Sequence, residues 1–249
     1  MWVSQNFLTS AKTIQRLIRK TSITATDHVI EIGPGKGHIT GALLRRCKKV
    51  SAIEIDKNLY DKLLYKYEAA DKLKLYHQDF LKWSLPTAGQ YKVFANIPFS
   101  HTTDIIMKLT RAINPPTEAW LVVEKGAAKR FMGIPRENMR SLFLKPLFDM
   151  RVIYHFARED FHPMPGTDVV MLHIKRKAIN DIPRPQWQSY QSFISRATKN
   201  NGNGLAHLFT KKQWTKARKL AGLNDQISGE ILYIQWLCLF RCYKGYARK

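Results

Sequence analysis

Residues 29–37 read Val29-Ile-Glu31-Ile-Gly33-Pro-Gly35-Lys-Gly37, a short apolar run that leads into three alternating glycines. The run is typical of a buried strand, and apolar residues at helical spacing follow at 39–46. Glycines between a strand and a helix let the backbone turn tightly and approach a ligand without a Cβ in the way. The stretch therefore predicts a nucleotide-type site at the carboxyl edge of a sheet.

The alternation of strand and helix continues along the first two-thirds of the chain. Further strands are expected at 50–55, 73–77, 91–95 and 120–123, with helices at 59–67 and 102–112. Two late strands, 151–156 and 169–174, flank a proline-bearing turn at 163–166. Repeated β-α units predict an α/β fold with a mostly parallel, doubly wound sheet and right-handed crossovers.

The character of the sequence changes near residue 177. A proline-bearing linker at 181–185 is followed by helical patterns, no convincing strand and a denser basic charge. We therefore expect two domains. Residues 1–177 would form a Rossmann-like catalytic domain that binds the cofactor, and residues 178–249 a small, basic, all-α RNA-binding domain.

Charge is the unusual feature of the composition. The 249 residues include 41 Lys and Arg against 19 Asp and Glu, which gives a net charge of +22. A polyanionic partner would relieve the self-repulsion, and nucleic acid fits better than a membrane surface or a merely soluble basic protein. Cys47, Cys238 and Cys242 form no metal or disulfide pattern, so no metal is expected. Without a visible signal peptide or an apolar run long enough to span a bilayer, the expected location is the cytoplasm.

The glycine loop indicates which cofactor is bound. Gly33, Gly35 and Gly37 are spaced G-x-G-x-G, unlike the G-x-G-x-x-G of dinucleotide sites. The acidic Glu31 before the loop favours the positively charged methionyl group of S-adenosyl-L-methionine over a pyrophosphate. Glu54 ends the next strand about twenty residues on, where an acid accepts hydrogen bonds from ribose hydroxyls. The alternative for Glu54 is a surface acid at a strand end.

Other residues are expected to complete the cofactor site. Ile55 lies beside Glu54, and Asp79 with Phe80 would contact the cofactor adenine, although an Asp after a strand is also a common turn residue. The stretch from Gln5 to Leu8, including Asn6, would close over the methionine part. Ser10, which follows, fits a simple helix cap equally well.

The segment after the fourth expected strand, Asn96-Ile97-Pro98-Phe99, carries the predicted chemistry. An amine on an aromatic base is a poor nucleophile, because its lone pair is delocalised into the ring. The Asn96 side-chain oxygen and the Ile97 carbonyl would accept hydrogen bonds from the amine and favour a tetrahedral nitrogen. Pro98 would stiffen the loop. Phe99 would stack on a flipped base. The alternative is an ordinary loop.

Two further groups of residues are candidates for RNA contact. Phe161 precedes the turn and would supply a second stacking face for the target base, or else be a core aromatic beside a turn. Phosphate contacts are expected from six cations, for each of which the alternative is a solvated surface charge: Lys129, Arg130, Arg136, Arg140, Lys211 and Lys212.

Over nearly its whole length the chain resembles the Erm (erythromycin ribosome methylase) family of methyltransferases. The resemblance is carried by residues 5–10, 31–38, 52–56, 96–99, 121–125 with 129–130, 161–163 and 208–214. It implies N6-methylation of one adenine in 23S ribosomal RNA and resistance to macrolides, lincosamides and type B streptogramins. It also implies that the chain acts as a monomer on naked RNA or an assembling large subunit.

Three departures from the family pattern are visible. Phe99 stands where many members have Tyr, so a role for the tyrosine hydroxyl is not expected here. The turn at 166–169 differs from the commoner pattern. A basic leader before Gln5, seen in many relatives, is expected to be missing or trimmed.

Two rival functions remain open. A sister enzyme that dimethylates adenines of the small-subunit RNA shares the cofactor motif and the Asn96–Phe99 pattern, but residues 121–125 and 208–214 favour the Erm interpretation. A non-enzymatic nucleic-acid-binding protein on a methyltransferase fold is the rival from another class. The intact Asn96, Glu54 and glycine loop argue against it.

Overall fold

The computed structural model describes residues 6–199, 204–205, 207–223 and 230–246. The chain forms two compact units, each of which brings together two segments. One comprises Met1–Ala128 with Met150–Arg176 and holds the sheet. The other comprises Lys129–Asp149 with Lys177–Lys249 and is helical.

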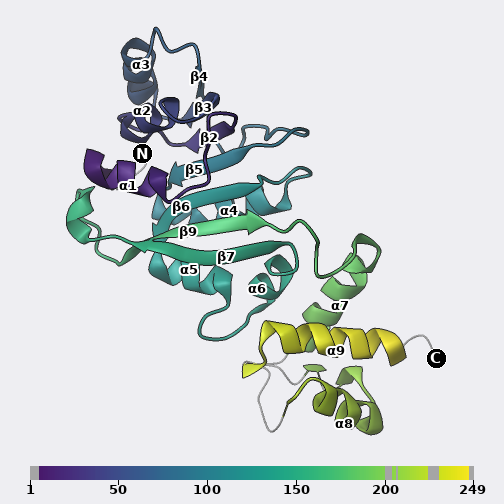
Figure 1. The fold of residues 1–249 in the computed structure, drawn as a ribbon. Helices are drawn as coiled ribbons and strands as arrows, with labels where there is room; N and C mark the ends of the chain where they lie inside the picture. The colour runs from purple at the N-terminus through teal and green to yellow at the C-terminus, as the bar shows by residue number, and fades with distance from the viewer. Residues whose placement is uncertain (1–5, 200–203, 206, 224–229, 247–249) are drawn as a thin grey trace. The chain divides into compact units, whose positions relative to one another are not determined.

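The first unit is built on the predicted mostly parallel sheet (Figure 1). Its seven strands lie in the order β4 (Leu73–His77), β3 (Lys49–Glu54), β2 (His28–Ile32), β5 (Lys92–Asn96), β6 (Glu118–Glu124), β9 (Val169–Arg176) and β7 (Phe148–His155). The first five strands in this order, from β4 through β3, β2 and β5 to β6, pair in parallel. Strand β9 runs antiparallel to β6. Because successive strands are added on opposite sides of β2, the order reverses between β2 and β5. Ligands of such sheets bind at the carboxyl ends of the strands at this reversal.

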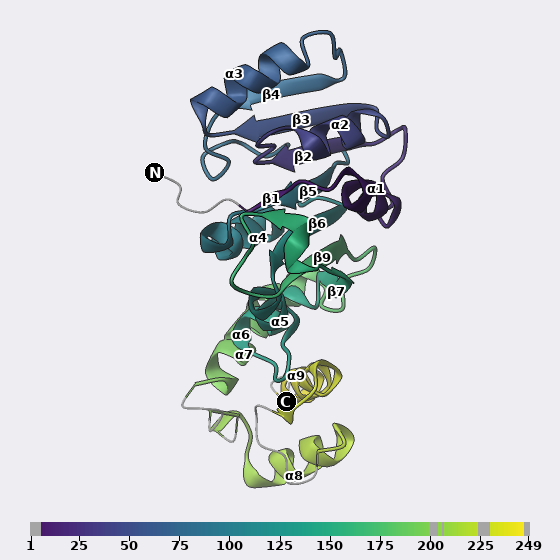
Figure 2. The ribbon, with the colours of Figure 1, turned by 90° about the vertical axis from the view of Figure 1, so that its left-hand side faces the viewer.

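Helices cover both faces of the sheet. One buried core joins sheet residues to α1 (Ala11–Arg19) and α2 (His38–Leu44), and it includes Val29, Val50, Phe94, Trp120, Ile14, Leu17, Ile39 and Leu43. Because side chains alternate along a strand, the buried Ile30, Val93 and Leu121 face the other side. Figures 1 and 2 place α4 (Thr102–Arg111) there. Helices α3 (Lys57–Lys66) and α5 (Lys125–Met132) follow β3 and β6.

The N-terminal segment forms a small ladder that no sequence pattern predicted. Strand β1 (Phe7–Leu8) pairs antiparallel with β8 (Phe161–His162), with Phe7 opposite His162 and Leu8 opposite Phe161. A two-residue strand has no periodicity to detect, and its partner lies about 150 residues away, which explains the omission. The helix expected near Ser10 is present, and the Ser10 hydroxyl caps it by accepting from the Thr13 amide at 3.2 Å.

The helical unit contains α6 (Met139–Leu144), α7 (Trp187–Ala197), α8 (Lys211–Leu220) and α9 (Tyr233–Tyr246). Short 3-10 turns occur at Phe99–His101 and Arg158–Asp160 in the first unit and at Arg184–Gln186 in this one. Its core is strongly aromatic and includes Tyr190, Phe193, Trp236 and Phe240. Within the part of the chain that the structure describes, no helix has both the length and the apolarity needed to cross a membrane.

The predicted domain ranges, 1–177 and 178–249, differ from the compact units at residues 129–149 and, by one residue, at Lys177. Residues 129–149 group with the C-terminal helices. The reason is packing: Leu142 of α6 is fully buried in the helical core, and the Tyr190 hydroxyl donates to its carbonyl oxygen at 2.9 Å. The RNA-binding role of the helical unit stays a prediction.

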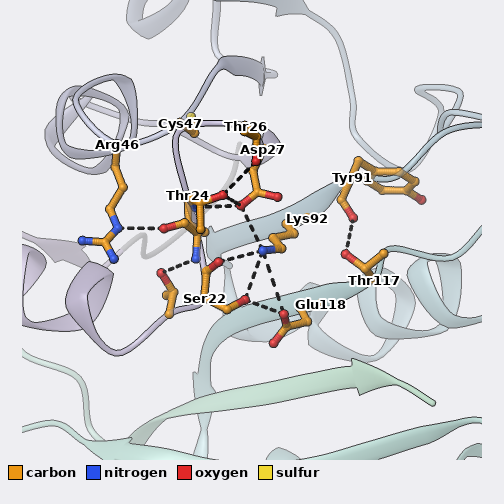
Figure 3. Close-up of polar contacts among 12 residues, drawn as sticks. Ser22, Thr24, Thr26, Asp27, Arg46, Cys47, Tyr91, Lys92, Thr117 and Glu118 are labelled. Carbon is orange, nitrogen blue, oxygen red and sulfur yellow. Dashed lines mark hydrogen bonds and ion pairs between the residues drawn. The ribbon is translucent and has the colours of Figure 1, made fainter. Parts of the chain in front are cut away.

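A polar cluster ties the strands together at the amino edge of the sheet (Figure 3). The Lys92 ammonium donates to the Ser22 carbonyl at 2.7 Å and to Asp27 Oδ2 at 2.9 Å, and it lies 4.0 Å from Glu118 Oε1. Glu118 Oε2 lies 2.7 Å from His173 Nε2. Lys92 thus joins β5 to β6 and to the segment before β2, and His173 adds β9 through its hydrogen bond with Glu118.

The cluster shifts the ionisation of its members. Burial raises the pKa of Asp27, but the hydrogen bonds from Lys92 and Thr24 outweigh it, so the net pKa lies below its ordinary value. Burial lowers the pKa of His173 despite its hydrogen bond with Glu118, so the imidazole is neutral at pH 7. Lys92 is therefore the cation that Asp27 and Glu118 share.

Replacement Lys92→Ala is expected to lower the free energy of unfolding by about 2–4 kcal/mol, because it leaves two largely buried carboxylates without their cation. Urea unfolding followed by tryptophan fluorescence measures this. Because Asp27 has a lowered pKa, its contribution is present above its ordinary pKa of 3.8 and is lost as the pH falls through the folded value. The difference from wild type should shrink below about pH 4.

Lys57→Ala is the matched control for this experiment. Lys57 pairs with Asp61 on α3, but both side chains are more than half exposed. Such a pair contributes about 0–1 kcal/mol. If both variants lost the same free energy of unfolding, the removal of one positive charge, and not the loss of the buried contacts, would explain the effect.

Candidate cofactor and target-base site

The glycine loop connects β2 to α2 at the strand-order reversal. Gly33, Gly35 and Gly37 have φ angles of 64°, 57° and 78°, in the left-handed region that favours glycine. A Cβ on Gly35 would stand 2.8 Å from the Phe7 ring, and one on Gly37 would stand 2.6 Å from Leu63. The loop thus needs glycine both for its backbone conformation and for its close packing.

Glu54 holds this loop against the end of β3. Its Oε2 accepts from the Gly35 amide at 3.0 Å, and its Oε1 accepts from the Asp56 amide at 2.9 Å. The residue is 1% exposed, and burial raises the pKa of its carboxyl although both amides oppose the shift. Each oxygen keeps a second lone pair, which suits the predicted ribose hydroxyls.

Glu31 is a second buried acid beside the loop. It is 1% exposed, and neither carboxyl oxygen has a hydrogen-bond partner that meets normal geometry. Burial raises the pKa of Glu31 to about 8; the neighbouring Thr40 opposes this shift and the charge of Glu54 adds to it. With that pKa the Glu31 carboxyl is mostly protonated at pH 7, and a nearby cationic ligand would favour its ionised form whereas a pyrophosphate would oppose it. The site therefore fits S-adenosyl-L-methionine better than a pyrophosphate.

The segment after β4 forms a tight turn at the predicted adenine contact. Asp79 is half-buried and its Oδ1 accepts from the Leu81 amide at 2.8 Å, so part of its carboxylate serves the turn. Phe80 is buried and stacks on Trp83 with ring centroids 6.4 Å apart. Ile55, on the neighbouring loop, accepts at its carbonyl from His77 at 3.2 Å, in the tautomer that puts hydrogen on Nε2.

Lys108 of α4 braces this turn, a role that the sequence did not predict. Its ammonium donates to the carbonyls of Leu81 at 2.8 Å and Trp83 at 2.6 Å, and it lies 5.2 Å from the centre of the Phe80 ring. Burial lowers the pKa of Lys108, opposed by the charge of Asp79. Because Lys108 lies 25 residues or more from its partners along the chain, no local sequence signal could have identified it.

Asn96 ends β5 at the carboxyl edge, and its amide is oriented by the N-terminal segment. Its Nδ2 donates to the Asn6 carbonyl at 2.8 Å. Only the amide nitrogen can donate to a carbonyl, so the Asn96 side-chain oxygen is left to accept. The structure thus gives Asn6 a place beside Asn96, in addition to the cofactor contact predicted for it.

The three residues after Asn96 leave the strand together. Ile97 is 2% exposed and fixes the loop in the core, while Pro98 has an extended backbone with φ −57° and ψ 129°. Phe99 begins a 3-10 turn and is half-buried against the core of the sheet. Part of its ring is therefore free to meet a base.

Phe161 and Leu8 come together through the β1–β8 ladder. Phe161 is 3% exposed and packs on Phe156 with ring centroids 5.1 Å apart. This is the core-aromatic arrangement given above as the alternative, and the stacking role of Phe161 stays a prediction. Leu8, also 3% exposed, belongs to the same core, whereas Gln5 lies outside the described residues.

The predicted phosphate contacts all fall in the helical unit. Lys129, Arg130 and Arg136 are exposed, and Arg136 lies 3.8 Å from Glu230. Arg140 is half-buried over the Phe131 ring. Lys211 and Lys212 are exposed on the first turn of α8, which continues with three further cations, Lys216, Arg218 and Lys219.

The comparisons with known proteins cover nearly the whole chain. The model of the ribosomal RNA adenine dimethylase family matches residues 2–231. An rRNA adenine N-6-methyltransferase of Limosilactobacillus reuteri is 34% identical over 245 residues, 98% of this chain and 97% of that protein. A protein of the same description from Escherichia coli is 33% identical over 240 residues, 96% of this chain and 94% of that protein.

Two solved structures are similar over the same extent. The crystal structure of the 23S rRNA methyltransferase ErmE has a TM-score of 0.88 and 25% identity, covering 96% of this chain and 100% of that chain. A dimethyladenosine transferase from Plasmodium falciparum has a TM-score of 0.76 and 22% identity, covering 97% of this chain and 98% of that chain. The second likeness concerns the fold alone.

Lys108→Met is expected to weaken S-adenosyl-L-methionine binding by up to about 30-fold, because two carbonyls lose a donor worth about 1 kcal/mol each and the turn at Asp79 and Phe80 loosens. Isothermal titration calorimetry measures the affinity. Lys82→Met, which removes an exposed charge from the same turn, is the control and should bind normally. Equal weakening in both variants would contradict a bracing role for Lys108.

Proposed function

The chain belongs to the ribosomal RNA adenine dimethylase family and is an rRNA adenine N6-methyltransferase, and we propose that its target is one adenine of 23S ribosomal RNA. The proposal includes resistance to macrolides, lincosamides and type B streptogramins, because a methylated adenine would crowd their shared site. It is supported by the similarity to ErmE, which is called a 23S rRNA methyltransferase, over 96% of this chain.

One observation carries the proposed chemistry. The Asn96 side-chain nitrogen donates a hydrogen bond to the Asn6 carbonyl, so the Asn96 side-chain oxygen remains as an acceptor. We propose that this oxygen and the Ile97 carbonyl accept from the amino group of the target adenine. These contacts localise the nitrogen lone pair, which the aromatic ring otherwise withdraws. No general base is needed at the start, because the proton can leave after methyl transfer.

The remaining residues position the two reactants. S-adenosyl-L-methionine supplies an electrophilic methyl group when bound. Glu54 would accept hydrogen bonds from the ribose of that molecule, and the backbone of the glycine loop would lie close to the cofactor. The Asp79–Phe80 turn would contact the cofactor adenine. Phe99 would stack on the target base, and the exposed cations of the helical unit would hold the RNA backbone. Proximity of this kind supplies a large part of the rate in group transfer.

A second candidate target is an adenine of small-subunit RNA. The matching family model is described as a dimethylase, and a dimethyladenosine transferase shares the fold with a TM-score of 0.76. The RNA that is methylated distinguishes the two candidates, and the number of methyl groups added can be measured as well.

The deciding experiment follows a labelled methyl group from S-adenosyl-L-methionine to protein-free transcripts of 23S and 16S RNA. Label on an adenine of the 23S transcript alone is expected. Asn96→Ala should lower transfer at least a hundredfold while cofactor affinity stays near normal, since the variant removes one acceptor made for the reacting amine. Label on 16S RNA would contradict the proposed target, and near-normal turnover of Asn96→Ala would contradict the mechanism.

Phe99 provides an independent test of base stacking. Phe99→Ala should lower kcat/KM by about 5- to 150-fold, which corresponds to the roughly 1–3 kcal/mol of one base–aromatic stack. Phe99→Tyr keeps the ring and should retain most of the activity. Thermal unfolding of both variants checks that the half-buried ring is not simply needed for folding. Similar losses in both would argue against stacking.

A further inference from the structure

Met164 is an exposed apolar side chain on a stiff loop. It is 65% exposed and stands between Pro163, also exposed, and Pro165, which is buried. Two prolines restrict the backbone on either side of it, so little backbone entropy is lost when the loop meets a partner. A methionine exposed on such a loop is available for contact with a partner.

The loop that carries Met164 is fastened at both ends. On one side, His162 pairs with Phe7 in the β1–β8 ladder. On the other side, the Asp168 carbonyl accepts from the Lys125 amide at 2.9 Å, and the Asp168 carboxylate lies 3.1 Å from the Lys125 ammonium. The Thr167 hydroxyl donates to Glu124 at 3.1 Å. The loop around Met164 is thus held in place at both of its ends.

Met164 projects from the same edge of the sheet as Asn96. Asn96 pairs with Val122 on β6, and two residues further along β6, Glu124 pairs with Val169, where the loop ends. A second connection runs through the N-terminal segment, since Asn96 donates to the Asn6 carbonyl and the next residue, Phe7, pairs with His162. The loop and the proposed acceptor of the target amine are therefore mechanically linked.

We propose that Met164 is a wedge that enters the base stack of the RNA and occupies the gap left when the target adenine is extruded. The inference rests on the proposed function and goes beyond it. An adenine inside a stack must leave it before its amine can reach Asn96, and unstacking costs a few kcal/mol. Apolar side chains inserted between base steps stabilise such gaps in other protein–nucleic acid complexes. The flexible, polarizable thioether suits the faces of the flanking bases.

The test compares two RNAs that share the sequence around the target adenine: a hairpin with that adenine inside a closed stem, and a short oligonucleotide that lacks the complementary strand and stays unpaired. Met164→Ser should lower kcat/KM for the hairpin about tenfold and affect the unpaired RNA much less, because only the hairpin requires a gap to be filled. Met164→Leu should restore the hairpin reaction. Ile113→Ser is the control, since Ile113 is 90% exposed in the turn before β6, at the opposite edge of the sheet.

A fluorescence measurement reports the gap without catalysis. With 2-aminopurine at the target position of the hairpin, binding of the wild-type protein should raise the emission, and Met164→Ser should reduce that rise at saturating protein. Equal losses of activity on both RNAs, or an unchanged emission in Met164→Ser, would overturn the wedge. If the wild type methylates neither RNA, the proposed function itself fails and the inference fails with it.

Discussion

The buried carboxylate of Glu54 is the contact on which the candidate site depends. It accepts one hydrogen bond from the glycine loop and one from the loop after β3, and so joins the two loops that flank the proposed cofactor site. Three glycines with positive φ make the first loop possible, because any Cβ at Gly35 or Gly37 would collide with neighbouring side chains. A carboxylate that is 1% exposed is costly unless hydrogen-bonded, and here both oxygens are. The strand-order reversal places this pair of loops where ligands of doubly wound sheets bind.

The N-terminal segment, residues 6–8, links several parts of the candidate site. It crosses the carboxyl edge, supplies the Asn6 carbonyl that orients Asn96, and continues as β1 along β8. Residues 6–8 thereby connect the predicted chemistry at Asn96 with the loop around Phe161. The two ends of the sheet differ in purpose. The amino edge carries the Lys92 cluster, in which two carboxylates share one cation, whereas the carboxyl edge exposes Met164 and leaves the oxygen of Asn96 to accept hydrogen bonds.

The sequence alone was sufficient for the fold class and for the place of the glycine loop between strand and helix. Short-range patterns located the strands and this loop, and they gave the predicted roles of Glu54 and of the Asn96–Phe99 segment, because each is encoded by a few consecutive residues with a characteristic period or composition. The resemblance to the Erm family extended the prediction to the reaction, and the relatives at 33–34% identity bear out the family. A pair of late strands around a proline-bearing turn was also expected, and β7 and β9 are neighbours in the sheet.

Only the tertiary structure decided what depends on contacts between distant residues. It paired β1 with β8, brought Lys108 under the Phe80 turn, placed Asn6 beside Asn96 and grouped residues 129–149 with the C-terminal helices. It also decided that Phe161 is buried while Met164, three residues later, is exposed. The physical reason is range. Hydrophobic periodicity and backbone preference act over a few neighbouring residues, so they can be recognised in the sequence. The partner of a carbonyl or of an ammonium group can lie far away along the chain, and it is set by how the whole sheet packs.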